Sequence, residues 1–86
     1  MELPIDEINY VESDGNYQMF YTNDKVYKSR FTVKQVSELL PESMFTQVHR
    51  AYIVNKRKIE KYNLKSVVVN NTEIPLSKSF SDNLNN

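Results

Sequence analysis

The sequence predicts a mainly β domain of small antiparallel sheets, with one short helix and a short C-terminal helical turn. Three observations support this fold class. Short segments rich in β-branched and aromatic residues recur along the chain, separated by polar residues that favour turns. Only one segment, around residues 32–40, has the apolar period of an amphipathic helix. Many short strands with little helix are typical of antiparallel sheets, because antiparallel strands need only short connections.

The first elements are expected to form a β-hairpin. Residues 8–12 and 17–22 are strand-like, and residues 13–16 between them favour a turn. Gly15 is the only glycine in the chain, so its place in this turn indicates a positive φ or a close backbone approach. Asn23 and Asp24 are expected to form the next turn, which leads into a third strand at residues 26–30.

One helix is predicted to begin after Thr32. Thr32 and Gln35 have the spacing of a capping box, and Phe31 and Val36 occupy the two positions of a hydrophobic staple. Pro41 ends the helix, because the residue before a proline avoids the α conformation. The expected packing stripe consists of Val33, Val36, Leu39 and Leu40. The opposite side offers only a few polar residues, so we expect this helix to serve packing; they are Lys34, Gln35, Ser37 and Glu38.

The second half of the chain is expected to contain five more strands, at residues 45–48, 52–54, 59–62, 66–69 and 72–76. Asn70 and Asn71 suit a two-residue hairpin turn, because asparagine tolerates a positive φ. Pro75 places its strand at a sheet edge or its residue at a strand end. A helical turn capped by Ser77 or Ser79 is expected to follow, with residues 80 and 84 packed on the domain.

Composition excludes several classes of protein. The chain has 86 residues, which fits one small domain, and it has no cysteine and only one histidine. Disulfides, cysteine-ligated zinc and a zinc site of several histidines are therefore excluded. No apolar run is long enough to cross a membrane, and no signal-like leader opens the chain. We expect a cytoplasmic protein without cofactor, metal or membrane partner.

The net charge of zero hides a segregation along the chain. Residues 1–24 have six acidic residues and no basic one, which gives −6. Residues 25–65 have ten basic and three acidic residues, which gives +7, and residues 66–86 sum to −1. A basic middle segment can present one positive face to a polyanion, because the local field matters more than the total charge. The alternative is a mixed, solvated surface.

An enzyme is not expected. His49 has no cysteine nucleophile or G-x-S-x-G turn to act with, the carboxylates do not cluster, and no glycine-rich phosphate loop is present. Three roles remain open for His49. It could hold its own loop by a hydrogen bond, contact a phosphate, or transfer a proton.

Polar side chains that suit nucleic acid gather at the ends of the predicted strands. Arg50 stands out, because a guanidinium fixed on a β framework matches guanine or phosphate bidentately. For one arginine taken alone, a surface pair with a carboxylate is the simpler interpretation. The wider set favours nucleic-acid contact. Its clusters are Asn16-Tyr17-Gln18, His49-Arg50, Asn55-Lys56-Arg57-Lys58 and Ser77-Lys78-Ser79.

The order and spacing of four blocks resemble the LytTR domain, the DNA-binding output domain of a group of bacterial response regulators. The blocks are Ile8-x-Tyr10-x-Glu12-Ser13-x-Gly15-Asn16-Tyr17, the capped helix ending Leu39-Leu40-Pro41, Phe45-x-x-Val48-His49-Arg50-x-Tyr52-Ile53-Val54-Asn55-x-x-x-Ile59, and Ile74-Pro75-Leu76-Ser77-Lys78. The resemblance runs from about residue 6 to residue 84. It implies a LytTR-like β sandwich that inserts loops into successive major grooves of bent double-stranded DNA.

The resemblance also implies roles for individual residues. Gln18, Arg50 and Lys78 fall at the base-contacting positions. Phosphate-contacting or supporting positions fall at Asn16, Tyr17, His49, Lys56, Arg57, Ser77 and Ser79. Two residues depart from the family pattern. Ala51 replaces a more usual serine, which can remove one backbone contact, and Lys78 replaces a more usual arginine, which exchanges a bidentate fork for a point charge.

The resemblance sets expectations for the larger context. We expect residues 1–5 to be a linker remnant, residues 6–84 the DNA-binding domain and residues 85–86 a tail. In the family a receiver domain or a membrane segment normally precedes such a domain, so this chain is expected to be an excised fragment or a truncated member. The implied partner is promoter DNA with repeated sites, which paired copies of the domain could occupy.

Two other functions are consistent with the residues. A β-rich protein-interaction module could accept a partner strand at a sheet edge, with the lysines protecting that edge. Its binding would survive high salt, whereas phosphate contacts weaken steeply as salt rises. An RNA-binding module could use tyrosines on a sheet face, and it would prefer single strands.

Overall fold

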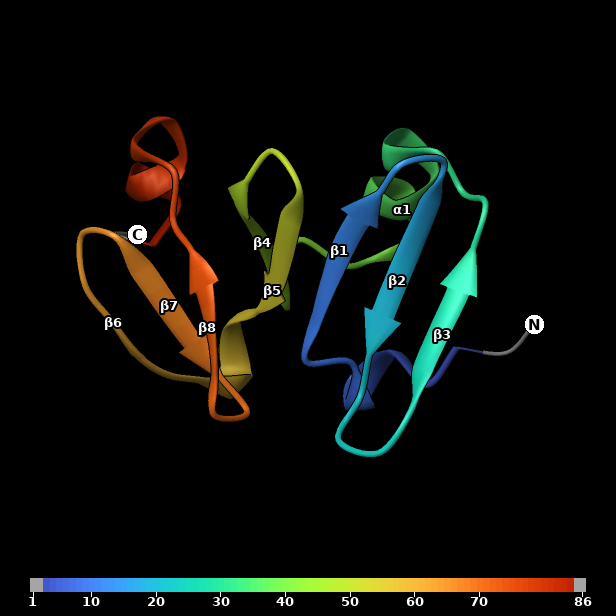
Figure 1. Cartoon of the computed structure of the whole chain (residues 1–86), viewed down its shortest axis with the longest axis horizontal. Helices are drawn as coiled ribbons and strands as arrows, with labels where there is room; N and C mark the ends of the chain where they lie inside the picture. Colours follow the sequence, from blue (N-terminus) through green and yellow to red (C-terminus); the bar gives the residue numbers. More distant parts are fainter. Residues whose placement is uncertain (1–2, 85–86) are drawn as a thin grey trace.

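The computed structural model describes residues 3–84, which form two antiparallel sheets, one helix and three short 3-10 segments (Figure 1). The five-stranded sheet has the order β3-β2-β1-β5-β4 and the three-stranded sheet the order β6-β7-β8. The strands are β1 (Tyr10–Asp14), β2 (Tyr17–Tyr21), β3 (Val26–Ser29), β4 (Phe45–His49), β5 (Tyr52–Asn55), β6 (Ile59–Tyr62), β7 (Ser66–Val69) and β8 (Thr72–Pro75). The helical segments are η1 (Ile5–Glu7), α1 (Val33–Leu39), η2 (Lys56–Lys58) and η3 (Lys78–Leu84). The predicted fold class is confirmed.

The ends of the chain bear on the expected linker and tail. Residues 1–2 of the expected linker remnant and the whole expected tail, residues 85–86, lie outside the described residues. Leu3 and Ile5 pack against a buried core, and η1 begins at Ile5. Residues 3–5 therefore contribute to the packing of the domain.

The hairpin turns follow from residues that tolerate positive φ. Asp14 and Tyr17 pair directly, so the first turn contains only Gly15 and Asn16 and is tighter than the expected residues 13–16. Gly15 has a φ of 62°, as its place in the sequence predicted. Asn70 and Asn71 have φ values of 51° and 59°, which is the type I′ arrangement that matches the twist of the flanking strands.

The helix α1 is capped as predicted but packs by a narrower stripe. The Thr32 side chain accepts a hydrogen bond from the backbone N–H of Gln35, and the Gln35 side chain accepts one from the backbone N–H of Thr32. Val36 and Leu40 are buried, whereas Val33 and Leu39 are 44% and 41% exposed. The prediction that all four apolar residues face the core was therefore wrong for Val33 and Leu39. Because the helix has only seven residues, the sheet covers one narrow side of it and Val33 and Leu39 remain in solvent.

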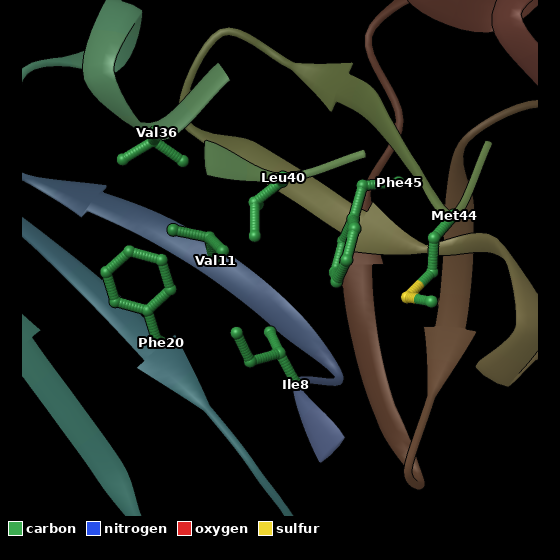
Figure 2. Close-up of a cluster of buried hydrophobic side chains, with 7 residues drawn as sticks. All are labelled: Ile8, Val11, Phe20, Val36, Leu40, Met44 and Phe45. Atoms are coloured by element: carbon green, nitrogen blue, oxygen red, sulfur yellow. The ribbon is translucent and has the colours of Figure 1, made fainter. Parts of the chain in front are cut away.

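Two buried cores lie on opposite faces of the five-stranded sheet. The first is covered by α1, and in Figure 2 Val36 and Leu40 point from the helix region toward Val11 of β1, with Phe20 of β2 beside them. Successive strand residues face opposite sides, so Tyr10 packs in the other core. That second core joins β4 and β5 to the small sheet. Its buried members are Val48, Val54, Val67, Val69, Ile74 and Leu76.

The last segments fit the expected positions with one difference. Pro75 ends β8, an edge strand of the small sheet, as predicted. Leu84 of η3 packs against the second core. The hydroxyls of Ser77 and Ser79 lie 3.0 Å apart and bond to each other, in place of the expected side-chain cap.

Candidate nucleic-acid interface

The turn between β1 and β2 carries the first cluster of predicted site residues. Asn16 is exposed and Tyr17 is half-buried. Gln18 is only 5% exposed, and its side-chain oxygen accepts a hydrogen bond of 2.7 Å from the Ser13 hydroxyl. The first turn therefore presents Asn16 to solvent, whereas a base contact by Gln18 would require this side chain to leave Ser13.

The turn between β4 and β5 carries Arg50, which is exposed. Within residues 3–84, no hydrogen bond or ion pair uses its guanidinium. Its backbone is held from β4, because the Gln47 side-chain amide donates to the carbonyl oxygens of His49 at 3.2 Å and of Arg50 at 3.4 Å. A register shift between Gln47 and His49 precedes the turn. The turn is thus fixed while the arginine side chain remains available to a ligand.

His49 takes the first of the three roles left open by the sequence. Its Nδ1 accepts a hydrogen bond from the backbone N–H of Ala51 at 3.1 Å, so it holds its own loop. The ring also meets Tyr52 edge-on, with ring centroids 5.6 Å apart. An acceptor Nδ1 assigns the proton of neutral His49 to Nε2. That N–H can donate to an outside acceptor such as a phosphate oxygen.

The junction between β8 and η3 carries the third cluster. Lys78 and Ser79 are exposed, and no hydrogen bond in the described part of the chain uses the Lys78 ammonium. The junction is tied to β4 by two bonds. The backbone N–H of Ser77 donates to the Val48 carbonyl at 2.8 Å, and the Asn83 side chain donates to the Gln47 carbonyl at 2.8 Å.

These three connections lie along one edge of the molecule. In Figure 1 the β1–β2 turn, the β4–β5 turn and η3 all lie at the upper edge, spread along the longest axis. The backbone N–H of Ser13 donates to the Ala51 carbonyl at 2.8 Å, which joins the first turn to the second. The bonds from Ser77 and Asn83 join the second connection to the third. We call this surface, formed by residues 14–18, 49–51 and 77–79, the loop edge.

Lys56 and Arg57 are not brought to the loop edge. They lie in η2, which follows the end of β5 opposite to the β4–β5 turn (Figure 1). The Lys56 ammonium donates to the Glu42 carbonyl at 3.0 Å, and the neighbouring Lys58 ammonium donates to the Glu7 carbonyl at 3.2 Å. The basic middle segment therefore divides its charges between two edges, and does not form the single positive face that the sequence suggested.

Tyr10, Tyr21 and Tyr52 form a cluster around Glu12 on one face of the five-stranded sheet, with Tyr10 and Tyr21 at the end of the β1–β2 hairpin away from its turn. Tyr10 and Tyr21 stack with centroids 4.5 Å apart, and the hydroxyls of Tyr21 and Tyr52 donate to the two oxygens of Glu12 at 3.3 and 3.2 Å. Burial raises the pKa of Tyr10 to about 12, with smaller contributions from Tyr21, Glu12 and Tyr52. Burial, followed by the charge of Glu12, also raises the pKa of Tyr21 and of Tyr52. The sequence indicated tyrosines on a sheet face as a possible RNA-binding surface, but which tyrosines meet around Glu12 depends on strand register.

Two kinds of feature are absent from residues 3–84. No group of three or more histidine, cysteine, aspartate or glutamate side chains is placed to hold a metal ion there. No helix in that range is long and apolar enough to cross a membrane.

Comparison with known proteins gives matches over most of the chain. The model of the LytTr DNA-binding domain family matches residues 1–86. The sensory transduction protein LytT of Enterococcus faecalis (strain ATCC 700802 / V583) is 25% identical over 81 residues, which cover 87% of this chain and 34% of that protein. The chain thus spans about a third of the length of this relative. A solved LytTr DNA-binding domain from Bacillus cereus has the same fold, with a TM-score of 0.81 and 19% identity over 95% of this chain and 81% of that one.

Proposed function

This chain belongs to the LytTr DNA-binding domain family, and from this membership we propose that it is the sequence-specific DNA-binding output domain of a bacterial transcriptional regulator. The family is one of DNA-binding domains, and the absence of catalytic activity is part of the proposal. We further propose that the loop edge is the surface that meets double-stranded DNA, with its turns entering successive major grooves. The upstream receiver domain of such a regulator is part of the proposal, and the greater length of the curated relative is consistent with it.

The observation that carries this proposal is the common edge of three connections, two of which carry an exposed cationic side chain with no carboxylate partner among the described residues. Arg50 and Lys78 are exposed on neighbouring turns, and in the described residues neither charge is used by a carboxylate. The longest dimension of the domain is 34 Å, close to the length of about 34 Å of one turn of B-DNA. Tight turns are narrow enough for a major groove about 12 Å wide. A domain of this length, with its three connections spread along the longest axis, can therefore reach two neighbouring grooves on one side of a duplex.

The proposed roles follow from chemistry and exposure. Arg50 can bind guanine bidentately, whereas Lys78 offers a point charge to a base or a phosphate. Gln18 is buried against Ser13, so we propose that it supports the first turn in the free domain and reaches a base only if DNA releases it. The proposed phosphate contacts on the loop edge are Asn16, Tyr17, the Nε2 of His49, Ser77 and Ser79. Lys56 and Arg57 lie outside this surface.

The proposal is tested by titrating labelled duplexes selected from a random pool. Arg50→Ala is expected to weaken binding to the selected duplex by about 1–3 kcal/mol and to relax its sequence preference. Lys56→Ala is the matched control, because it removes a cation from the opposite edge and should leave affinity nearly unchanged. An Arg50 variant that binds as tightly as the wild type would refute the assignment.

The same titration separates the competing functions. Binding through phosphates weakens steeply as salt rises, whereas strand addition by a protein partner would survive high salt. A preference for single-stranded RNA over duplex DNA would favour RNA binding through tyrosines on the sheet face. Selected sites that contain a short motif repeated at about one helical turn would support paired copies on promoter DNA.

A further inference from the structure

Two cations beside the first turn share one aromatic ring. The ammonium of Lys28 lies 4.0 Å from the centroid of the Tyr17 ring, and the guanidinium carbon of Arg30 lies 5.5 Å from it. The Arg30 guanidinium also donates a hydrogen bond of 3.2 Å to the Tyr17 hydroxyl. Strand register explains the cluster. Gln18 pairs with Ser29, so the end of β3 lies beside the start of β2.

Both charges remain available to an anion. Lys28 and Arg30 are exposed, and the partner that holds them is a neutral ring and hydroxyl. Asp14 pairs with Tyr17 across the hairpin, but it forms no ion pair with either cation within residues 3–84. An aromatic ring orients a cation without neutralising it, whereas a carboxylate would cancel its charge. The cluster is therefore a fixed positive site at the surface.

A hollow lies directly beside this cluster. It opens between the β1–β2 turn and the connection from β3 to α1, and its lining includes Asn16, Gln18, Arg30 and Thr32. Amide, hydroxyl and guanidinium groups of this kind are common partners of DNA phosphates. The hollow belongs to the same end of the molecule as the loop edge, because Asn16 and Gln18 line it.

We propose that Lys28 and Arg30, oriented by Tyr17, bind a backbone phosphate of the duplex at the hollow, outside the stretch addressed by Arg50 and Lys78. In Figure 1 the β3–α1 connection lies at the end of the upper edge opposite to η3. The phosphate contact therefore extends the protein–DNA interface at its outer end. This inference rests on the proposed function, and it adds a sequence-independent contact to it.

The test compares three variants of the whole chain on the selected duplex and on a scrambled duplex. The double variant Lys28→Gln, Arg30→Gln removes both cations and keeps side chains of similar length. Lys25→Gln is the matched control, because Lys25 is exposed at the other end of β3. Tyr17→Phe removes the hydroxyl that accepts from Arg30 and keeps the ring. Circular dichroism melts check that each variant folds.

The expected result is a change in the salt dependence of binding. The slope of log K against log salt should become shallower by about 0.9 for each phosphate that the variant no longer neutralises, and affinity for both duplexes should fall by the same factor. Lys25→Gln should keep the wild-type slope. Tyr17→Phe should weaken both duplexes equally, by less than the double variant. Ethylation of a phosphate at the outer end of the site should inhibit the wild type and not the double variant.

Other results identify which statement fails. If the wild type shows no preference for duplex DNA, the proposed function fails. If the wild type binds specifically and the double variant keeps its salt slope, this inference alone is overturned. A double variant that loses the preference between the two duplexes also overturns it, because Lys28 or Arg30 would then contact bases.

Discussion

Gln47 is expected to control how well Arg50 is presented to DNA. Its side-chain amide is the donor that holds the two carbonyl oxygens of the β4–β5 turn, those of His49 and Arg50. Gln47→Ala removes both bonds and leaves the His49–Ala51 bond and the strand pairing in place. The variant should therefore keep the fold while the turn that carries Arg50 becomes more mobile.

The magnitude follows from the geometry of the two bonds. At 3.2 and 3.4 Å they are longer than the common value of about 2.9–3.0 Å, so each should contribute near the lower limit of about 0.5 kcal/mol. Together they stabilise the turn by about 1 kcal/mol. If DNA must order the loosened turn again on binding, the same free energy appears as a loss of affinity of about fivefold.

Urea unfolding and fluorescence titration measure the two effects separately. Gln47→Ala should lower the free energy of unfolding by about 1 kcal/mol and weaken the selected duplex about fivefold, with a smaller effect on a scrambled duplex. Thr46→Ala is the control, because Thr46 is the neighbouring half-buried residue of β4 and its side chain has no bond to the turn. If Gln47→Ala loses the expected stability but binds DNA with unchanged affinity, the two hydrogen bonds of Gln47 do not position Arg50 for binding.

Two further predictions concern stability. Thr32→Ala removes the side chain that accepts from Gln35 at the start of α1, so the free energy of unfolding should fall by about 1 kcal/mol, and a urea midpoint equal to that of the wild type would contradict this value. Burial raises the pKa of Tyr10 to about 12, above the value of about 10 expected in the unfolded chain, so its contribution to stability is complete below about pH 10 and is lost as the pH rises toward 12. Because solvent screens this partly exposed group, the loss of unfolding free energy between about pH 10 and 12 should be about 1 kcal/mol. The loss should be smaller in Tyr10→Phe, and equal profiles of unfolding free energy against pH for the two proteins would show that Tyr10 does not contribute to the pH dependence.

Local chemistry accounts for what was correctly anticipated about the fold. Gly15, Asn70 and Asn71 adopt positive φ because their side chains permit it, and Thr32 and Gln35 cap α1 because their spacing suffices. The predicted apolar stripe of α1 was right for Val36 and Leu40 only, since the periodicity does not reveal how much of the helix surface the sheet can cover. The strands were placed well because each is marked by its own residues and bounded by polar turns.

The candidate interface depended more on tertiary structure. The sequence pointed to Arg50 and Lys78, and the structure leaves both side chains exposed on the loop edge. Gln18 belonged to the same motif, but its burial against Ser13 depends on the pairing of β1 with β2. Gln47 has no distinguishing sequence pattern, because its role depends on the carbonyl groups of a turn that only the folded chain forms.

By itself the sequence determined the fold class, the strands, the capped helix and the polar turns, because these depend on interactions between residues close along the chain. Only the tertiary structure decided which turns lie together. The placement of β1 between β2 and β5 brings the first turn beside Arg50, while η2 at the far end of β5 carries Lys56 to the opposite edge. Such placements arise from pairing between distant strands and from burial on two faces of one sheet, which no local pattern encodes.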